Sequence, residues 1–129
     1  MALGPVTQIH ISVTDIGRSV AFYRDVLGIP LLFEVPGQSM AFFASGDVRL
    51  YLGVPESADF ASRCTLYFRV DDIAVEHRRL LAAGVQFSGE PHVVHRDGTT
   101  ALWMAACTDP DRHNLVLMEE RPTGPVPRS

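Results

Sequence analysis

The sequence predicts an α+β fold of two βαβββ modules, whose curved and mostly antiparallel sheets surround a cup-shaped cavity. An internal repeat is the first indication: the stretch ISVTDI at 11–16 returns as FRVDDI at 68–73, and each copy reads as a strand that runs into an acidic helix start. Each helix pattern then ends at a glycine, Gly28 or Gly84, the residue favoured at a left-handed C-cap. Runs rich in β-forming residues, separated by turn residues, follow each glycine. Two such copies must cover each other's apolar surface, and we expect a pocket between them.

Length and composition limit the classes of function. The 129 residues, 47% hydrophobic and 20% charged, suit one globular domain, which we expect over 1–121 with a flexible Pro/Gly-rich tail at 122–129. The net charge of −4 comes without a basic stripe, so no nucleic-acid partner is expected. No apolar run approaches the ~20 residues of a membrane span, and the N-terminus lacks signal-peptide features. We therefore expect a cytoplasmic protein with no membrane partner, in which Cys64 and Cys107 are buried thiols.

Module one is expected over about 5–54. It opens with a strand at 7–13, followed by a helix at 16–27. Thr14 or Asp15 can cap this helix, because both side chains accept hydrogen bonds from first-turn N–H groups. Turn residues then separate three predicted strands, at 31–35, 40–44 and 48–53.

Module two is expected over about 63–120, after a linker at 55–63. It repeats the order of module one, with a strand at 64–70 and a helix at 73–83. Three further strands are predicted at 85–94, 100–107 and 114–119.

Alternation within the strands separates two faces. In the first strand Ile9 and Ile11 oppose His10, and in the last strand of module one Leu50 opposes Tyr51. The aliphatic face is the one on which a helix must pack. The second face mixes polar and aromatic side chains but lacks the Lys and Glu typical of a solvated sheet. This composition favours a semi-enclosed pocket over the competing interpretation, a plain solvent-facing surface.

His10 is the main titratable candidate on the second face. It suits a pocket base or a hydrogen-bond donor to a ligand; equally, it suits a core histidine satisfied by Tyr67, its repeat partner. Arg49 and Arg69 can hold a ligand anion or phenolate, or can lie at strand ends and reach solvent. No catalytic residue beyond the candidate His10 is predicted.

Aromatic and methionine side chains would form walls for a flat apolar ligand, although ordinary core packing is a competing explanation. Trp103, the only tryptophan, would stack on a ligand at the pocket mouth or close a dimer interface. The predicted ligand-binding residues are Gln8, His10, Met40, Phe42, Arg49, Tyr51, Thr65, Tyr67, Arg69, Trp103, Val116 and Met118.

Two segments carry a family resemblance. The stretch DIGRSVAFYRDVLG at 15–28 and the run DPDRHNLVLMEE at 109–120, which is similar to a DPDGN turn and final strand, resemble the vicinal oxygen chelate superfamily. That group includes glyoxalase I, methylmalonyl-CoA epimerase, extradiol dioxygenases, fosfomycin-resistance enzymes and bleomycin-resistance binding proteins. The resemblance covers essentially the whole ordered chain and implies the glyoxalase/bleomycin-resistance fold. It does not distinguish among the activities of the superfamily.

The resemblance also indicates where a metal would bind. Metal-dependent members of the glyoxalase and epimerase type hold a divalent ion with four strand residues. The corresponding positions here are Gln8, Tyr51, Thr65 and Val116. Only Gln8 is a side chain that some members use, whereas a site needs about three good nitrogen or oxygen ligands. We therefore expect no metal and no cofactor.

These observations favour a metal-free binding protein that sequesters a flat apolar or aromatic compound, such as a drug or natural product. Two enzyme alternatives remain open. One is a metal-dependent lyase, isomerase or dioxygenase whose ligands lie at other positions. The other is a metal-free enzyme that uses His10 as a base, with Tyr67 or an arginine as electrophile.

We expect a homodimer, as the resemblance implies, because short open sheets gain from pairing and symmetric dimers are the commonest solution. Light scattering at micromolar concentration should give twice the chain mass of 14.2 kDa. A single-chain mass would contradict this prediction.

Overall fold

The computed structural model describes residues 2–123 and divides into two compact units. Within the described residues, unit 1 comprises 2–64 together with Asp109–Arg112, and unit 2 comprises Thr65–Thr108 together with 113–123. Each unit has its own four-stranded sheet and its own helix. No helix within 2–123 is long and apolar enough to cross a membrane.

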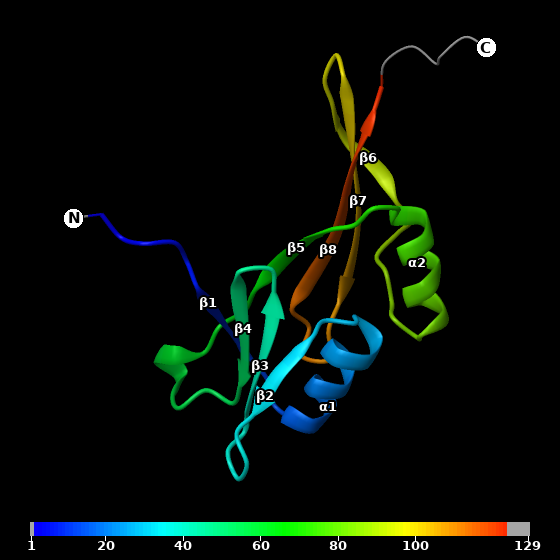
Figure 1. The fold of residues 1–129 in the computed structure, drawn as a ribbon. Helices are drawn as coiled ribbons and strands as arrows, with labels where there is room; N and C mark the ends of the chain where they lie inside the picture. The colour runs from blue at the N-terminus through cyan, green and yellow to red at the C-terminus, as the bar shows by residue number, and fades with distance from the viewer. Residues whose placement is uncertain (1, 124–129) are drawn as a thin grey trace. The chain divides into compact units, whose positions relative to one another are not determined.

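Unit 1 contains a mixed sheet with strand order β1-β4-β3-β2 (Figure 1). Strands β1 and β4 pair in parallel, and the other neighbours are antiparallel. Its elements are β1 (Gln8–Ser12), α1 (Ile16–Ala21), the π-helical η1 (Phe22–Val26), β2 (Leu31–Glu34), β3 (Met40–Ser45), β4 (Val48–Gly53) and the 3-10 helix η2 (Ala58–Phe60).

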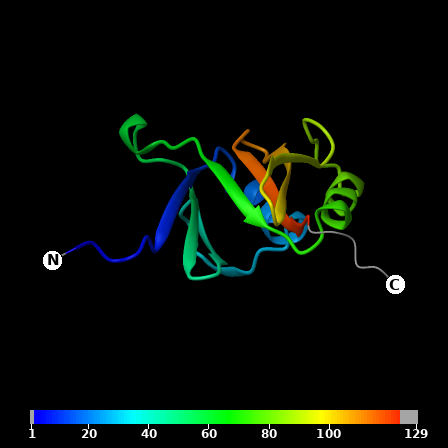
Figure 2. The same ribbon diagram turned by 90° about the horizontal axis from the view of Figure 1, so that it is seen from above.

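Unit 2 repeats this arrangement with strand order β5-β8-β7-β6, and α2 lies along one side of its sheet (Figures 1 and 2). Its elements are β5 (Thr65–Arg69), α2 (Ile73–Ala82), β6 (His92–Arg96), β7 (Thr100–Thr108) and β8 (Asn114–Pro122). The predicted α+β fold of two βαβββ modules is confirmed. Each sheet contains one parallel pair, formed by the first and last strands of its module.

The predicted strand at 85–94 is wrong in position. The strand there, β6, begins only at His92, and upstream of it Phe87 forms an isolated bridge with Cys107. The sequence SGEP at 88–91 separates the two, and proline cannot donate to a sheet ladder. At the other end of the unit, β8 continues to Pro122, inside the segment predicted as a tail. Residues 124–129 of that predicted tail lie outside the described part of the chain.

The first helix changes character midway. Its N-cap is Asp15, whose side chain accepts a hydrogen bond from the backbone N–H of Arg18 at 3.0 Å. After α1, the backbone N–H of Leu27 donates to the carbonyl of Phe22 at 2.9 Å, five residues earlier, as in a π-helix. The predicted helix at 16–27 therefore consists of an α-helical and a π-helical part. Gly28 follows it with a φ of 78°.

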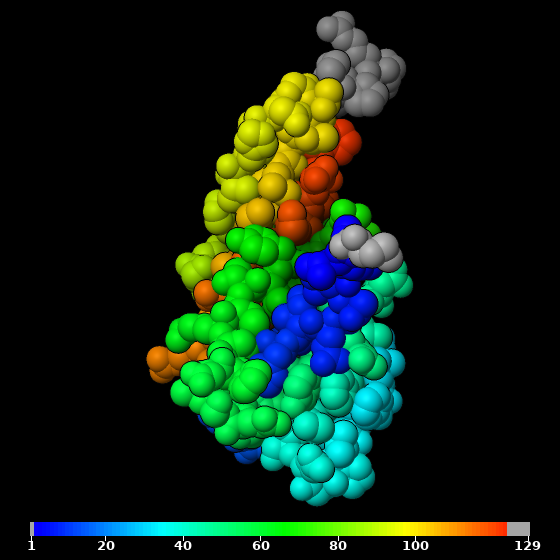
Figure 3. Space-filling view, turned by 90° about the vertical axis from the view of Figure 1, so that its left-hand side faces the viewer, coloured from blue at the N-terminus to red at the C-terminus, as the bar shows by residue number. Residues whose placement is uncertain are grey.

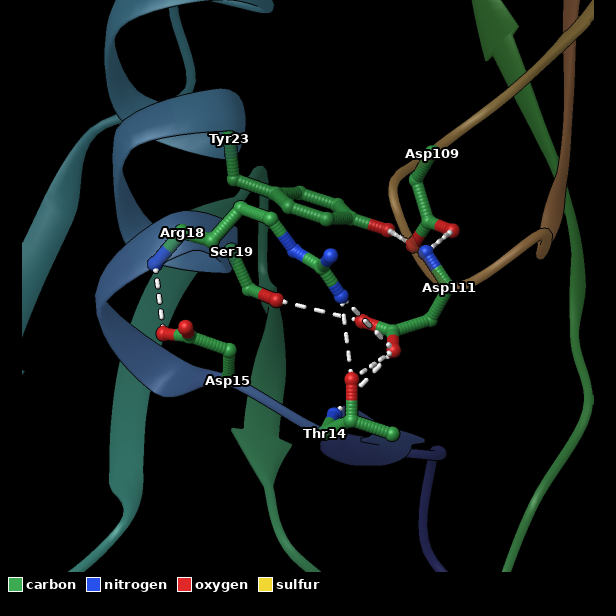
Figure 4. A network of polar contacts seen from close by, with 7 residues as sticks. All are labelled: Thr14, Asp15, Arg18, Ser19, Tyr23, Asp109 and Asp111. Atoms are coloured by element: carbon green, nitrogen blue, oxygen red, sulfur yellow. Dashed lines mark hydrogen bonds and ion pairs between the residues drawn. The ribbon is translucent and has the colours of Figure 1, made fainter.

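A fully buried tyrosine joins this helix to the turn between β7 and β8. The Tyr23 hydroxyl donates to Asp109 Oδ2 at 2.7 Å (Figure 4). The other oxygen of Asp109 accepts the backbone N–H of Asp111 at 2.9 Å. Burial and the negative charge of Asp109 raise the pKa of Tyr23 far above its usual range, so its hydroxyl stays protonated as a donor.

Asp111 extends the same network to the start of α1. Its Oδ1 accepts the Thr14 hydroxyl at 2.7 Å, and its Oδ2 accepts the Ser19 hydroxyl at 3.2 Å (Figure 4). Arg18 also lies 3.4 Å from Asp111 Oδ1. These contacts explain why the turn at 109–112 belongs to unit 1 while the strands on either side of it belong to unit 2.

His77 of α2 has a buried side chain. Its ring meets the Phe87 ring edge-to-face, with the two centroids 4.5 Å apart. The neighbours of His77 in the sequence are charged and the ring that contacts it comes from the segment after α2, so no local pattern marks its burial.

Replacing Tyr23 with Phe should lower the free energy of unfolding by about 1.5–3 kcal/mol, the scale of a buried hydrogen bond to a charged group. The change keeps the ring and removes only the donor to Asp109. Urea denaturation at neutral pH measures it.

The matched control is Tyr67→Phe, because Tyr67 is 58% exposed and should change stability by less than about 0.5 kcal/mol. Equal losses in the two variants would contradict the assigned role of Tyr23. The ordinary tyrosine pKa is 10.0, so above pH 10 the unfolded chain loses the Tyr23 proton that the folded chain keeps. Wild-type stability should therefore fall above pH 10, and Tyr23→Phe should lack that contribution.

Candidate functional site

A row of four rings crosses the sheet of unit 1. His10 of β1 pairs with Tyr51 of β4, Tyr51 pairs with Phe42 of β3, and Phe42 pairs with Phe33 of β2. Successive ring centroids lie 4.7, 4.8 and 4.7 Å apart. Tyr51 and Phe42 are stacked with planes 14° apart, whereas His10 meets Tyr51 edge-on. We call these four residues the aromatic row.

The aromatic row lies on the face of the sheet opposite the buried aliphatic residues. Ile11 and Leu52 are fully buried, and Phe43 packs near Tyr23 with ring centroids 5.9 Å apart. In contrast, Phe33 is 46% exposed, and the other rings of the row are partly exposed. The alternation predicted for β1 and β4 is confirmed, and the register of β3 brings Phe42 beside Tyr51.

Gly53, at the end of β4, makes room for the ring of Tyr51. A Cβ atom at Gly53 would lie 2.7 Å from Tyr51 Cε1, closer than real carbon atoms approach. The tyrosine ring therefore leans along its own strand over a position that only glycine leaves open. Met40, another predicted site residue, is the β3 partner of Gly53. Sequence reasoning explained the glycines by turns and caps and did not identify this contact.

Arg49 supplies a positive charge at the edge of the aromatic row. Its Nε donates to Gln8 Oε1 at 3.0 Å, and its guanidinium carbon lies 5.5 Å from the centroid of the Phe42 ring. This is a cation–π distance. Gln8, Arg49 and Phe42, three predicted site residues from three strands, are therefore in one cluster.

Two serines form hydrogen bonds with His10, Ser12 with its ring and Ser62 with its backbone carbonyl. Its Nε2 is hydrogen-bonded to Ser12 Oγ at 3.1 Å, and Ser12 Oγ accepts the backbone N–H of Ser62 at 2.7 Å. Ser62 Oγ in turn donates to the His10 carbonyl at 2.7 Å. The segment before β5 (green) therefore lies along β1 (blue) in Figure 3. These bonds orient the imidazole against Tyr51.

Unit 2 has a cavity of about 600 Å³ on the corresponding face of its sheet. Tyr67, Arg69 and Met118, all predicted site residues, line it together with Leu102 and Glu120. Val70, Asp71 and Glu119 complete its lining. The cavity therefore combines apolar and aromatic side chains with one arginine and three carboxylates, and its lining is at least as polar as it is apolar.

Two further predicted residues neighbour this cavity along the sheet. Val116 is the β8 partner of Tyr67 and is 8% exposed. Thr65, at the start of β5, accepts a hydrogen bond from Asn114 Nδ2 at 3.4 Å.

Trp103 does not join these residues. It pairs with Glu119 across β7 and β8, on the face opposite Met118. The Arg121 guanidinium lies 4.7 Å from the Trp103 ring centroid, and Glu119 accepts the first backbone N–H of α2, that of Ile73, at 2.8 Å. Trp103 therefore lies on the helix-bearing face of the unit 2 sheet.

The four positions expected to hold a divalent ion in metal-dependent relatives do not fit one. The Gln8 amide oxygen is bound to Arg49, the Tyr51 ring is stacked, and Val116 has no donor atom. Within 2–123, no group of three or more His, Cys, Asp or Glu side chains is placed to hold a metal ion.

Phe33 is the site residue that sequence reasoning missed. The predicted strand included it, but simple alternation places it on the same face as Leu31. The register shifts between the two, so that Leu31 pairs with Phe43 while Phe33 pairs with Phe42. No local sequence signal marks this bulge.

Comparison with known proteins agrees with this architecture. The Glyoxalase/Bleomycin resistance protein/Dioxygenase superfamily profile matches residues 5–117. The Bacillus subtilis (strain 168) protein YraH is 30% identical over 122 aligned residues, which cover 84% of this chain and 92% of YraH.

Two solved structures share the fold at low sequence identity. Lactoylglutathione lyase from Agrobacterium tumefaciens matches with a TM-score of 0.74 and 20% identity, covering 92% of this chain and 95% of the lyase. TnmS3, an antibiotic binding protein from Streptomyces sp. CB03234, matches with a TM-score of 0.73 and 24% identity, covering 94% of this chain and 99% of TnmS3. The repeated βαβββ units, their strand order and the profile match together show that the chain belongs to the Glyoxalase/Bleomycin resistance protein/Dioxygenase superfamily.

Proposed function

We propose that this protein binds a flat aromatic or apolar small molecule, without a metal ion and without transforming it. The aromatic row is the observation that carries the proposal. Phe42 stacks between Phe33 and Tyr51, and His10 flanks the other side of Tyr51. A planar ligand would lie across the partly exposed ring edges of the row or stack on the outer face of Phe33, which is 46% exposed on the edge strand β2. Each aromatic contact contributes about 0.5–1.5 kcal/mol beyond the area it buries.

The row is already assembled, which supports binding. Gly53 leaves room for the Tyr51 ring to lean along β4, the Arg49 guanidinium lies over the Phe42 ring, and the hydrogen bond to Ser12 orients His10. Side chains that are ordered before binding cost less conformational entropy when the ligand arrives. Gln8 and Met40 are the remaining proposed ligand contacts in unit 1. In unit 2, Thr65, Tyr67, Arg69, Val116 and Met118 remain proposed contacts for a ligand at the cavity of that unit.

The relatives allow both binding and catalysis. One protein of the same fold is described as an antibiotic binding protein and another as a lyase. The choice for this chain therefore rests on its own side chains. Aromatic rings and an arginine offer stacking and charge, and the carboxylate and imidazole ligands of the metal-dependent relatives are replaced by Tyr51, Thr65 and Val116.

Replacing Phe42 with Leu should weaken binding of a planar ligand by about 0.5–1.5 kcal/mol, because it removes the ring that joins Phe33 to Tyr51 in the row and the ring edge that a ligand would contact. Ligands would first be found by thermal shift with a library of planar natural products and then titrated calorimetrically. Trp103 fluorescence is a poor reporter, because that ring lies on the other face of the unit 2 sheet.

The matched control is Phe43→Leu on the same strand. Phe43 is fully buried and faces Tyr23, so this variant should lose stability but keep the affinity of the wild type. If Phe42→Leu binds every ligand as tightly as the wild type, the aromatic row is not the binding surface.

Mass spectrometry of the recovered ligand separates binding from catalysis. We expect the ligand unchanged after long incubation. The His10–Ser12 hydrogen bond of 3.1 Å favours one alternative, an enzyme with His10 as base. A product formed by the wild type but not by His10→Asn would establish that alternative.

We also expect the purified protein to contain no stoichiometric divalent metal, because the four family positions lack the required ligands. Elemental analysis and thermal unfolding with and without EDTA test this, and the chelator should leave Tm unchanged. One equivalent of zinc, nickel or iron bound through side chains including Gln8 would refute it.

A further inference from the structure

We infer that the molecule recognised by the aromatic row carries a negative charge, as an aromatic carboxylate or phenolate, and that Arg49 binds this charge. The inference rests on the proposed function and specifies the ligand class of the same site. It depends on the position of Arg49, on its lack of an acidic partner, and on the neutrality of the surrounding face.

The groups that hold the Arg49 side chain in place are uncharged, so they do not neutralise its positive charge. Its one side-chain hydrogen bond is the 3.0 Å contact from Nε to the neutral amide oxygen of Gln8. This contact and the Phe42 ring, 5.5 Å from the guanidinium carbon, define where the charge lies. The two Nη groups make no hydrogen bond within the described part of the chain, so both can donate to a ligand.

Four other arginines are paired with carboxylates. Arg18, Arg24, Arg79 and Arg121 each lie within 3.4 Å of a carboxylate oxygen. Six arginines form no ion pair among residues 2–123, and within that part of the chain Arg49 is the one of the six that lies over an aromatic ring. The absence of an ion pair is therefore not specific to Arg49; its place beside the aromatic row is, and an anionic ligand on the row would be within reach of its charge.

The strand positions that share the face of Arg49 carry no negative charge. The positions of β1, β3 and β4 on this face hold polar, aromatic, small or methionine side chains and no Asp or Glu. Glu34 pairs with Ala41, which is buried on the opposite face. The acidic residue nearest to Arg49 in sequence, Asp47 in the turn between β3 and β4, lines a surface hollow together with Arg49 but forms no ion pair with it. The rings of the row therefore have a positive charge beside them and no carboxylate on their own strand faces.

Arginine also suits the geometry of this ligand class. A guanidinium binds a carboxylate through two parallel N–H···O bonds, and it does so in the plane of the two groups. Because Arg49 and Tyr51 project from the same face of β4, a ligand ring that lies across the exposed edges of Tyr51 and Phe42 can direct a carboxylate toward the Nη groups. A phenolate oxygen at the ring edge can accept the same hydrogen bonds.

Three naphthalene probes of one shape and different charge test the inference: 2-naphthoate, 2-naphthamide and 2-naphthylmethylammonium. Calorimetric titration of the full chain at neutral pH and low salt should rank the carboxylate first. We expect it to bind about fivefold more tightly than the amide, the scale of a partly exposed charge pair. The advantage should shrink at high ionic strength.

Two variants locate the charge effect. Arg49→Gln should abolish the advantage of the carboxylate, so that the carboxylate and the neutral amide bind this variant about equally tightly. Arg96→Gln, which removes an equal charge from an exposed residue of β6 with no ion pair among residues 2–123, should keep the advantage. If Arg49→Gln fails to fold, the salt dependence and probe order of the wild type still decide.

The outcomes separate this inference from the proposed function. Equal binding of carboxylate and amide, or tightest binding of the ammonium probe, overturns the anion inference but leaves the aromatic row as a binding surface. If Arg96→Gln abolishes the advantage of the carboxylate over the amide as fully as Arg49→Gln does, the anion inference is also overturned. Failure of all three probes to bind counts against the proposed function itself, and the anion inference falls with it.

Discussion

The register of three strands in unit 1 places His10, Tyr51 and Phe42 at directly opposite positions of β1, β4 and β3. Everything proposed for this protein depends on that alignment. Because side chains alternate strictly along a strand, a slip of one residue between β3 and β4 would move Phe42 to the helix-bearing face and bring Phe43 into the row. Burial of Phe43 and Leu50 under α1 disfavours that slip, so core packing also fixes the binding surface.

The buried hydrogen bond between Tyr23 and Asp109 has a comparable role in unit 1. It joins the π-helical turn after α1 to a short segment from the distant end of the chain. A carboxylate at a buried site is costly unless its oxygens are hydrogen-bonded, and Asp109 receives both the tyrosine hydroxyl and the backbone N–H of Asp111. The motif residues that carry the family resemblance are therefore mainly structural, which explains why they do not specify an activity.

Activity in this superfamily is decided by side chains that the fold presents, and the fold itself is shared by a lyase and an antibiotic binding protein. In this chain, the β1 and β4 positions that could hold a metal are used differently. Gln8 orients an arginine and Tyr51 stacks between His10 and Phe42. Strand positions that hold a metal ion in some relatives thus carry, in this chain, a row of aromatic rings with a positive charge beside it.

The sequence by itself determined the two βαβββ modules, the helix caps and the faces of most strands, because caps, turns and period-two alternation are local properties. It thereby predicted His10 on the face opposite Ile9 and Ile11, and Tyr51 on the face opposite Leu50. Only the tertiary structure decided that Phe33 joins them, since a bulge in β2 reverses the alternation. It likewise placed Trp103 on the helix face, buried His77 against Phe87 and bound Tyr23 to Asp109. Those outcomes depend on contacts between residues far apart in the chain, which no local pattern encodes.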